Sequence, residues 1–500
     1  MKVKSLLYLF LLFVSVAGKA QVNQSDSLAL VEFYNKTQPK NGSWDRHKNW
    51  LTSAPLTDWF GVTVANNRVT QLTLTFNNIT GKLPPSFLNL TALKKLNLRG
   101  NTALSIALSS NLSKLKNLSY LDLQSTNTTG AIPEQLTSLA KLEYLNLSSC
   151  FLTGSLPASI DKLQKLNTLI LTLSGLGGTL PAGIGNLPSL QVLYLNNNRF
   201  SGTLPAQGYL PSLTQWLVGG NGLSGNLPAW LSGSRQLYYF DIAGNNFSGP
   251  IPAAWGDSLK GLRYVYAGYN HLSGAIPEWL LQSPVLDDLE LNNNEFSRND
   301  NPCTVLSPSI LVYQLENNRY NFNGLECLKP NFGGFGNVSP QAPLKIGTKG
   351  KQLTLSAGGT LSNNTYSWYR VGTTQATVIA GDSSFTPTQS GQYYARVTNT
   401  AVPRLTLTTD TVTYTAAAKA AELHIAVSPN PTKGQVLLSG LNDKTDALVR
   451  VTDLSGHLWL QATSRKQAMI TLNVANLKPG TYFIAVSGNG GVKTLSLVKD

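Results

Sequence analysis

Carboxylates and histidines are the side chains of this 500-residue chain that could perform acid–base chemistry. Asp288 and Glu290 are two residues apart, so on a β-strand they would share one face at about 6–7 Å, a separation that glycoside hydrolases use. The four histidines are far apart and show neither metal-ligand spacing nor a neighbouring nucleophile. A strand face open to water does little to raise the pKa of one carboxyl above the other. The sequence therefore predicts binding rather than catalysis, with no catalytic residue, metal or cofactor.

Tyrosines, acids and amides recur around this pair at a regular interval. They occupy the third and fifth positions of a repeated segment, and both positions are expected to project outward from one face. Exposed tyrosine offers rigid contact area and one polar group, as recognition surfaces require; the alternative is that tyrosine merely suits exposed strands. We predict a ligand-binding surface made of Tyr120, Asp122, Tyr144, Asn146, Tyr194, Tyr239, Asp241, Tyr264, Tyr266, Tyr269, Asp288 and Glu290.

A repeating unit positions these side chains. It reads L-x-x-L-x-L-x-x-N-x-L-x-G-x-L/I-P, occurs eleven times between Val69 and about Pro330, and restarts every 23 to 25 residues. A fixed period of this length indicates a solenoid whose units bury their apolar sides against their neighbours. The L-x-L core alternates with period two, so each unit should contain a half-buried strand. Stacked units should then pair these strands into one long parallel sheet on the concave side.

An asparagine follows the strand in eight units and should bond to the backbone of adjacent coils. Thr126, Cys150 and Ser174 replace it in three consecutive units, where we expect the weakest asparagine ladder. Cys150 is expected to be a small buried residue rather than a reactive thiol. The G-x-L/I-P element should supply a turn and a second extended segment. Residues 104–108 of the second unit lack it, so the convex wall is expected to be irregular there.

The G-x-L/I-P signature resembles leucine-rich repeats of the plant-specific type, which occur in plant receptor ectodomains, polygalacturonase-inhibiting proteins and bacterial surface proteins. The resemblance implies a leucine-rich-repeat solenoid over residues 69–330. Residues 21–68 are similar to the N-terminal cap of this family, on the basis of Trp50 and the D-W-F-G-V stretch at 58–62. The cysteine pair usual around that stretch is absent. We therefore expect the cap to be held by packing of Trp44, Trp50 and Trp59.

Two further modules are expected after the solenoid, with residues 331–342 as a linker. Residues 343–415 change to short alternating strands, and S-G-Q-Y-Y-A-R-V at 390–397 resembles the G-x-Y-x-C-x-V stretch of immunoglobulin-like domains. Ala395 stands in the place of the cysteine. A β-sandwich that acts as a spacer is the favoured interpretation.

Residues 422–500 carry an ordered set of motifs: S-P-N-P at 428–431, D-x-x-G at 453–456, L-x-x-G-x-Y at 477–482, and Lys499. The set is similar to the C-terminal sorting domain of type IX secretion. The resemblance implies a small β-sandwich that is read by the outer-membrane secretion machinery of a Gram-negative bacterium and is usually removed. The product would then be attached to the surface or released. The fold class expected for the whole chain is mainly β with short helical pieces, a leucine-rich-repeat solenoid followed by two small β-sandwich domains.

The start of the chain and its cysteines indicate an exported protein. Residues 1–20 begin with Lys2 and Lys4 and continue with an apolar stretch and small residues before a cleavage site, as in a signal peptide, and no later segment is apolar enough to span a membrane. Cys303 and Cys327 flank the last repeat, and export favours a disulfide between them over two free thiols.

Charge argues against nucleic acid as a partner. The formal net charge is +14, but residues 69–330 contain 16 Lys+Arg against 14 Asp+Glu, a net of +2. The excess is therefore spread over the other segments and forms no basic stripe.

We expect a non-catalytic recognition protein, cell-surface or secreted, that binds an extracellular protein or glycan in an adhesin-like manner through the concave face. The type IX secretion machinery would be a second partner. The alternative is an inhibitor or glycan-binding accessory of polysaccharide-degrading enzymes. An enzyme remains a third interpretation only if the acids near Asp288 are enclosed.

Overall fold

The computed structural model describes residues 22–297, 306–328, 335–416, 424–488 and 491–500. These residues divide into two compact units. The first contains the described residues up to 387 and residues 391–413, and the second contains residues 388–390 and the described residues from 414 onward. Each unit is described by itself. The expected signal peptide and the expected Cys303–Cys327 pair lie outside the residues whose side chains are described.

The cap begins with helix α2 (Gln24–Lys36), whose first turn is capped by the side chain of Asn23. As expected, Trp44, Trp50 and Trp59 are all buried, with Trp50 packed against both of the others at ring-centroid distances of 4.9 and 4.8 Å. The fully buried carboxylate of Asp26 accepts two hydrogen bonds of 2.9 Å from the Arg68 guanidinium. It also accepts one of 2.7 Å from the backbone N–H of Val69, which ties the helix to the first repeat. A short 3-10 helix η1 (Leu56–Asp58) completes the cap.

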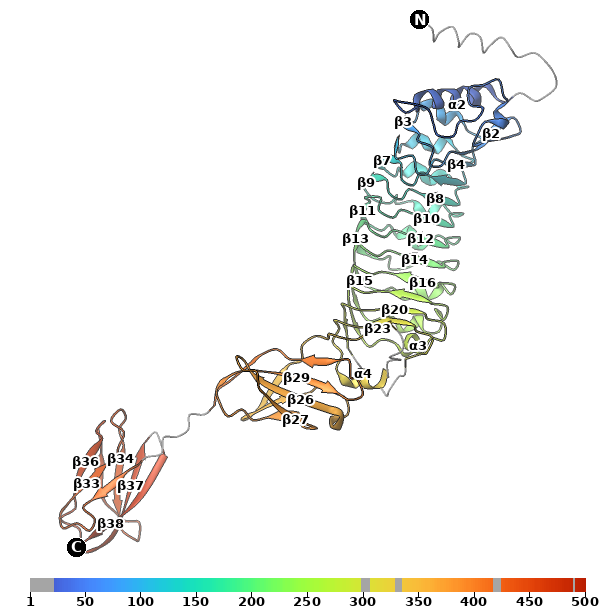
Figure 1. Cartoon of the computed structure of the whole chain (residues 1–500). Coiled ribbons are helices and arrows are strands. Elements are labelled where there is room, and N and C mark those ends of the chain that lie inside the picture. The colour runs from blue at the N-terminus through green and yellow to red at the C-terminus, as the bar shows by residue number, and fades with distance from the viewer. Residues whose placement is uncertain (1–21, 298–305, 329–334, 417–423, 489–490) are drawn as a thin grey trace. The chain divides into compact units, whose positions relative to one another are not determined.

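The solenoid is built on one long sheet (Figure 1), which we call the main sheet. Its first two strands pair antiparallel and the rest pair parallel, one strand from each coil. The central residue of each three-residue strand from β4 to β22 is buried and its two neighbours mostly face solvent, as the L-x-L alternation predicts. In order, the described strands are β1 (Val62–Ala65), β2 (Arg68–Thr73), β4 (Lys95–Asn97), β6 (Tyr120–Asp122), β8 (Tyr144–Asn146), β10 (Thr168–Ile170), β12 (Val192–Tyr194), β14 (Gln215–Leu217), β16 (Tyr239–Asp241), β18 (Tyr264–Tyr266), β20 (Asp288–Glu290), β22 (Val312–Gln314) and β23 (Phe335–Asn337).

A second extended segment in each coil forms two further parallel sheets. One contains β3 (Thr80–Lys82), β5 (Ala103–Ala107), β7 (Asn127–Ala131) and β9 (Phe151–Thr153). The other contains β11 (Gly177–Thr179), β13 (Arg199–Thr203), β15 (Gly222–Asn226), β17 (Asn246–Gly249), β19 (His271–Gly274) and β21 (Glu295–Phe296). The expectation of irregularity at residues 104–108 is wrong, because β5 pairs with both β3 and β7. Leu104 and Ile106 alternate with small residues and are buried, so this coil forms its strand without glycine or proline.

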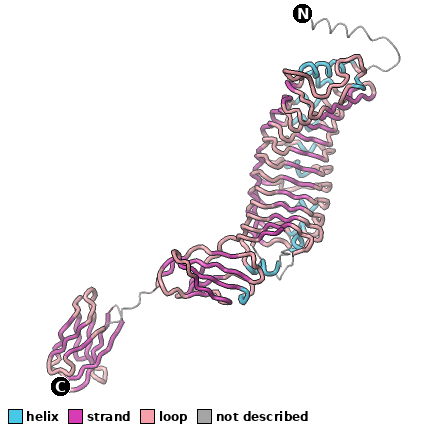
Figure 2. Tube along the Cα trace, in the orientation of Figure 1, coloured by secondary structure: helices cyan, strands magenta, loops and turns pink. Residues whose placement is uncertain are grey.

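Short helical turns lead from the second extended segment of a coil back to the main sheet in the next coil (Figure 2). Most are 3-10 helices, and five of them begin directly after the proline of the G-x-L/I-P element or its counterpart. Proline suits that position because its missing N–H would have no partner there. The elements are η2 (Pro85–Asn89), η3 (Ser110–Lys114), η4 (Glu134–Ser138), η5 (Ile160–Lys162), η6 (Ala182–Gly185), η7 (Ala229–Gly233), η8 (Ala253–Trp255) and the helix α3 (Glu278–Leu281).

The asparagine ladder binds adjacent coils together. Asn245 is representative: its Nδ2 donates to the carbonyls of Val218 and Ile242 at 3.1 and 3.0 Å, and its Oδ1 accepts from the N–H of Leu223 at 2.9 Å. Cys150 is buried, as expected, and its thiol reaches the carbonyl of Leu123 at 3.3 Å. Burial raises the pKa of that thiol, which keeps it protonated and unreactive.

The solenoid continues beyond the last predicted unit. Residues 335–337, expected to belong to a linker, form β23, which pairs in parallel with β22. Gln341 takes the ladder position: its Nε2 donates to the carbonyls of Leu315 and Val338 at 2.8 and 2.7 Å, and its Oε1 accepts from the N–H of Tyr320. The longer glutamine was not recognised in the sequence as an equivalent of the asparagine.

Helix α4 (Phe322–Leu328) precedes β23 in the chain and contacts the module that follows the solenoid. The N–H of Phe322 donates to the carbonyl of Ala357 at 2.8 Å. Glu326 accepts from the N–H of Thr360 at 2.8 Å and from the side chain of Asn399. These bonds hold the end of the repeat region against the module that follows it.

That module has two antiparallel sheets. One contains β24 (Ile346–Lys349), β25 (Gln352–Leu355) and β28 (Ser384–Phe385); the other contains β26 (Asn364–Arg370), β27 (Ala376–Ala380), β29 (Gly391–Asn399), β30 (Thr406–Thr408) and β31 (Val412–Tyr414), and η9 (Leu361–Asn363) precedes β26. Trp368 is buried, stacks on Phe385 of the other sheet at 5.4 Å, and pairs across the strands with Ala395. Packing of these residues takes the place of an inter-sheet disulfide.

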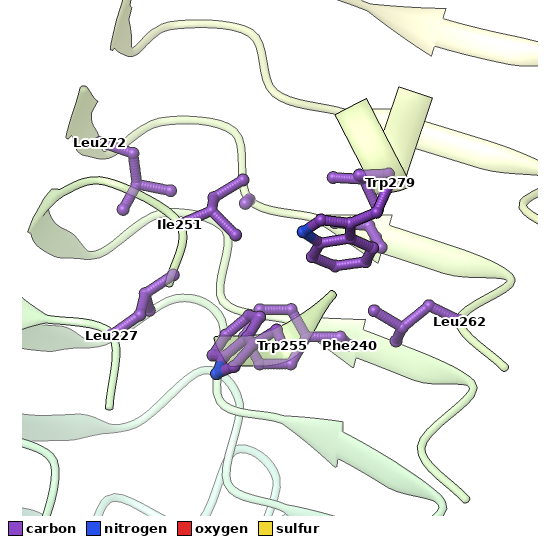
Figure 3. A pocket seen from close by; sticks show the side chains of 10 residues that line it. Leu227, Phe240, Ile251, Trp255, Leu262, Leu272 and Trp279 are labelled. Atoms are coloured by element: carbon purple, nitrogen blue, oxygen red, sulfur yellow. The ribbon is translucent and has the colours of Figure 1, made fainter. Parts of the chain in front are cut away.

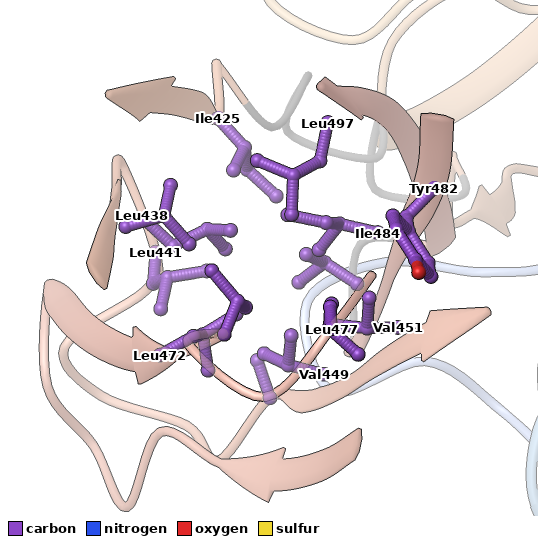
Figure 4. Packing of buried hydrophobic residues seen from close by; sticks show 14 residues of the cluster. Ile425, Leu438, Leu441, Val449, Val451, Leu472, Leu477, Tyr482, Ile484 and Leu497 are labelled. Atoms are coloured by element: carbon purple, nitrogen blue, oxygen red, sulfur yellow. The ribbon is translucent and has the colours of Figure 1, made fainter. Parts of the chain in front are cut away.

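The second unit also has two antiparallel sheets, and their inner faces form one apolar core (Figure 4). The strands are β32 (Ala426–Ser428), β33 (Gln435–Ser439) and β36 (Met469–Asn473) in one sheet, and β34 (Leu448–Thr452), β35 (Leu458–Thr463), β37 (Gly480–Gly488) and β38 (Gly491–Lys499) in the other. The sequence motifs of this unit are turns and strand ends. Asp453 accepts from the N–H groups of Ser455 and His457, and the hydroxyl of Tyr482 donates to the carbonyl of Lys478 at 3.0 Å.

Candidate functional site

The outward side of the main sheet, here called the concave face, carries the predicted binding residues in two straight columns. Parallel pairing in register places equivalent residues of successive coils side by side. The third-position column runs Tyr239, Tyr264, Asp288 and Val312 through the last four coils, and the fifth-position column runs Asp241, Tyr266, Glu290 and Gln314. All eight side chains are half-buried. The solenoid therefore gathers residues that are up to about 75 residues apart in sequence.

Three tyrosines and three acids form a cluster on strands β16, β18 and β20. The ring of Tyr239 lies 5.4 Å from that of Tyr264 and 5.5 Å from that of Tyr266, the second contact being edge-to-face. The hydroxyl of Tyr266 donates to Oδ2 of Asp288 at 2.9 Å. At the edge of the cluster, Nε2 of Gln314 lies 3.3 Å from Oε1 of Glu290. Sequence reasoning brought these residues together but did not select Gln314, although its place in the fifth-position column beside Glu290 was a usable signal.

Electrostatics within this cluster favour protonation of its acids. Burial raises the pKa of Glu290, and the nearby charges of Asp288, Asp241 and Glu316 raise it further. Burial also raises the pKa of Asp288 and of Asp241, against the opposing effects of the hydrogen bonds from Tyr266 and from the Ala243 N–H. The pKa values of Asp288 and Glu290 move in the same direction. A general acid paired with a general base needs them to move apart.

A second group lies on strands β4, β6 and β8. Tyr120 and Tyr144 stack with 4.2 Å between ring centroids and 6° between planes, and the ammonium of Lys95 lies 4.7 Å from the Tyr120 centroid. The hydroxyl of Tyr120 lies 3.4 Å from Oδ2 of Asp122. Nδ2 of Asn146 donates to the Tyr144 hydroxyl at 3.3 Å. Lys95 was not chosen from the sequence, although its place in the third-position column beside Tyr120 was a usable signal.

The fifth-position acids and amides have a structural task that the sequence did not reveal. Asp122, Asn146 and Asp241 each accept a hydrogen bond of 3.0 Å from the backbone N–H two residues further on. This Asx turn closes the end of the strand. Asp122 and Asn146 are only 2% exposed, so the expectation that they project into solvent is wrong.

The remaining predicted residues lie between and beside the two groups. Tyr194 lies near the middle of the sheet, and its hydroxyl donates to Oε1 of Gln215, whose Nε2 in turn donates to the Tyr238 hydroxyl at 2.6 Å. Tyr269 lies just past the end of β18, is 63% exposed, and has a left-handed backbone with φ of 56°. It therefore stands at the rim of the concave face rather than in the columns.

The interior of the solenoid offers no room for a ligand at the place shown in Figure 3. There, a space of about 10 Å³ lies among Leu227, Phe240, Trp255 and Trp279, all contributed by neighbouring coils. A volume of this size is at the lower limit for one water, and its apolar walls offer water no partner. In the described ranges, no group of three or more histidine, cysteine or acidic residues could hold a metal ion. None of the helices described is long and apolar enough to cross a bilayer.

Family comparison agrees with this architecture. Residues 70–301 match the leucine-rich repeat region, and residues 426–500 match the secretion system C-terminal sorting domain. The chain thus contains a leucine-rich-repeat region and a type IX secretion C-terminal sorting domain. The sorting domain directs export to the cell surface or the extracellular space.

Three plant proteins are among those to which the chain is similar. A probable leucine-rich repeat receptor-like protein kinase of Arabidopsis thaliana is 36% identical over 93 residues, which are 18% of this chain and 10% of the kinase. The leucine-rich-repeat ectodomain of the Arabidopsis thaliana receptor kinase GASSHO1/SCHENGEN3, solved in complex with CASPARIAN STRIP INTEGRITY FACTOR 2, has a TM-score of 0.54 at 28% identity, covering 64% of this chain and 44% of that one. A plant ice-binding protein has a TM-score of 0.51 at 25% identity, covering 58% of this chain and 91% of that protein. The chain thus spans a tenth of the kinase and less than half of the receptor ectodomain.

Proposed function

We propose that this protein is a non-catalytic recognition protein that binds an extracellular protein or glycan through the concave face, in the manner of an adhesin. The observation that carries the proposal is the cluster of Tyr239, Tyr264 and Tyr266 with the acids beside them. A central tyrosine ring in contact with two others on a solvent-facing sheet gives a rigid surface that loses little conformational entropy when a partner binds.

The arrangement of the sheet supports the same proposal. Neighbouring strands lie about 4.8 Å apart, so the eleven strands from β2 to β22 extend over roughly 50 Å. A surface of that length accommodates an extended chain or the flank of a folded protein. Export by the sorting domain brings this surface into contact with extracellular partners. The sandwich of residues 343–415, which we regard as immunoglobulin-like, would serve as a spacer.

The test is binding of the purified protein to cells and to immobilised matrix proteins and glycans. We expect the triple variant Tyr239→Ala, Tyr264→Ala, Tyr266→Ala to lose binding. A control variant removes two large exposed side chains away from the main sheet, Tyr209→Ala with Phe151→Ala, and should bind as the native protein does. Unchanged binding by the triple variant would place the binding surface elsewhere. A drop in the rate of a glycan-degrading enzyme on adding the protein would favour the inhibitor alternative instead.

A further inference from the structure

The two halves of the solenoid carry opposite net charge. Residues 69–165 contain nine Lys+Arg and four Asp+Glu, a net of +5, whereas residues 199–329 contain seven and ten, a net of −3. On the face itself the contrast is between Lys95 on β4 and the acids Asp241, Asp288 and Glu290 on β16 and β20. Eight strand spacings separate β4 from β20, which is about 38 Å.

The basic end is only partly compensated within the protein. Lys95 contacts the face of Tyr120 and makes no ion pair within 4 Å in the described parts of the chain. Arg99 lies with its guanidinium 5.6 Å from the ring of Phe76, an exposed residue at the adjacent rim. Asp122, the acid of this end, is buried and attracts Lys95 and Arg99, but among the described residues neither cation forms a direct ion pair with it. Lys95 and Arg99 are thus available to an acidic group of a partner.

The acidic end has carboxylates in excess. Oδ1 of Asp288 and Oε2 of Glu316 are inaccessible to water and accept no hydrogen bond from the described residues. The cations nearby are engaged elsewhere: Arg263 pairs with Asp287 at 2.6 Å, and Arg319 pairs with Glu295 at 2.9 Å. These two oxygens are out of a partner's reach, but the side chains of Asp241 and Glu290 are only half-buried, so a cationic group of a partner can pair with them.

Aromatic rings at the acidic end add a second attraction for cations. The ring of Tyr239 lies within 5.5 Å of the rings of both Tyr264 and Tyr266, and Tyr266 bonds to Asp288. The face of a tyrosine ring attracts an ammonium or guanidinium group. Arg263 already exploits this, since its guanidinium lies 5.7 Å from the Tyr264 centroid. Rings and carboxylates together match a lysine or arginine side chain.

We propose that the concave face docks an extended polypeptide segment whose basic side chains lie over β16–β22 and whose acidic group lies over β4 and β6. The inference rests on the proposed function and narrows its ligand from protein or glycan to polypeptide. Charges of both signs on one ligand, about 38 Å apart, are natural for a polypeptide, whereas glycan chains are mostly neutral or acidic. An extended segment of roughly 11 or 12 residues covers this distance at about 3.3 Å per residue.

Isothermal titration calorimetry of the full-length protein with synthetic peptides tests the docking. The main probe is a 14-residue Gly/Ser peptide with two aspartates at one end and two lysines at the other. The comparison probes are the same peptide without charges, one with lysines alone, one with aspartates alone, a neutral oligosaccharide, and calcium chloride without peptide. We expect the mixed-charge peptide to bind at least tenfold more tightly than every other probe and to weaken as salt is raised.

Charge-neutralising variants locate the two ends. Asp241→Asn, Asp288→Asn and Glu290→Gln combined should weaken the mixed-charge peptide at least tenfold, and Lys95→Gln should weaken it several-fold. Matched controls are Asp287→Asn, an acid already paired with Arg263, and Lys94→Gln, an exposed lysine that precedes the strand. Both controls should stay within twofold of the native protein. Amide substitutions keep side-chain shape, and unfolding midpoints no lower than that of the native protein would show that the fold is retained.

Several results would overturn the docking proposal: equal weakening by site and control variants, equal affinity for the uncharged peptide, or binding of the oligosaccharide or calcium alone. Failure of the proposed function gives a different pattern. If the tyrosine triple variant loses cell binding while the charge variants retain it, only the polypeptide inference fails. If the tyrosine triple variant retains cell binding, the concave face itself is not the binding surface.

Discussion

The hydroxyl of Tyr266 donates a hydrogen bond to Oδ2 of Asp288, 2.9 Å away on the adjacent strand. The bond joins the two columns of the concave face diagonally, because the direct neighbour of Tyr266 on β20 is Glu290. It fixes the orientation of the Asp288 carboxylate and leaves its other oxygen without a donor. Tyr266 thus fixes the acidic cluster through its hydroxyl as well as contributing its ring contact with Tyr239.

Replacing Tyr266 by phenylalanine should reduce partner binding several-fold with little loss of stability. The variant keeps the ring contact with Tyr239 and removes only the donor to Asp288, so the stability cost should be about 1 kcal/mol. Binding assays and urea unfolding of the same samples measure the two effects. Tyr264→Phe is the control, because no hydrogen bond of the Tyr264 hydroxyl occurs among the described residues. Equal effects of both substitutions on binding would contradict a specific role for the Tyr266–Asp288 bond.

Replacing Glu290 by glutamine should stabilise the protein at neutral pH. The pKa of Glu290 is raised in the folded state by burial and by neighbouring carboxylates, so the folded state holds its proton to a higher pH than the unfolded state does. Its ionisation therefore lowers stability as pH rises from the unfolded pKa through the folded pKa. The variant should gain on the order of 0.5 kcal/mol at pH 7, given the solvent screening of a half-exposed group, and nothing well below pH 4.

Urea unfolding at pH 3.5 and pH 7 measures this difference. The contrasting substitution is Glu295→Gln, which breaks the 2.9 Å ion pair with Arg319 and should lower stability slightly at pH 7. A stability gain for Glu290→Gln that is the same at both pH values would mean that ionisation is not its cause.

Removing a ladder asparagine should be among the more destabilising single changes in the solenoid. Asn245→Ala leaves the carbonyls of Val218 and Ile242 and the N–H of Leu223 without their buried partner, at a cost of roughly 2–4 kcal/mol. Ser174→Ala should cost less, since the Ser174 hydroxyl bonds only to the carbonyls of Leu171 and Leu147. Urea unfolding of both variants measures the difference. An equal loss would show that the ladder is no weaker where asparagine is absent.

Deleting residues 426–500 should keep the protein from reaching the outside of the cell. Those residues are the sorting domain, and they form their own apolar core, so their removal leaves the remaining residues to fold without them. Cell fractionation with an antibody against the solenoid should find the truncated protein in the periplasm. Surface display of the truncated protein would show that another segment directs export.

The sequence was most informative where a pattern repeats and least informative where one residue acts alone. Eleven copies of the unit predicted the main sheet, the two outward columns and the contacts of Tyr239, Tyr264 and Tyr266, because parallel stacking leaves no freedom of register. The repeat gave no information on Gln341, which reaches the ladder position with a different side chain. It also did not predict that Asp122 and Asn146 would be buried, because position in the unit does not reveal that a polar side chain will bond to the backbone two residues further on.

Leu173 occupies a position where its backbone is strained, and replacing it should stabilise the protein. It has φ of 54° and is 57% exposed, so the leucine neither suits the left-handed conformation nor gains from burial. Asn197, Asn293 and Asn317 hold the equivalent position in other coils with almost the same φ. Asparagine tolerates this region better than leucine does, so Leu173→Asn should raise the free energy of unfolding by about 1 kcal/mol. The reverse change, Asn197→Leu, should lower it by a similar amount.

Urea unfolding of both variants measures this, and two shifts of the same sign would contradict backbone strain as the cause. If Leu173→Asn stabilises the protein and also weakens binding to cells, the exposed leucine contributes to partner contact beside the concave face.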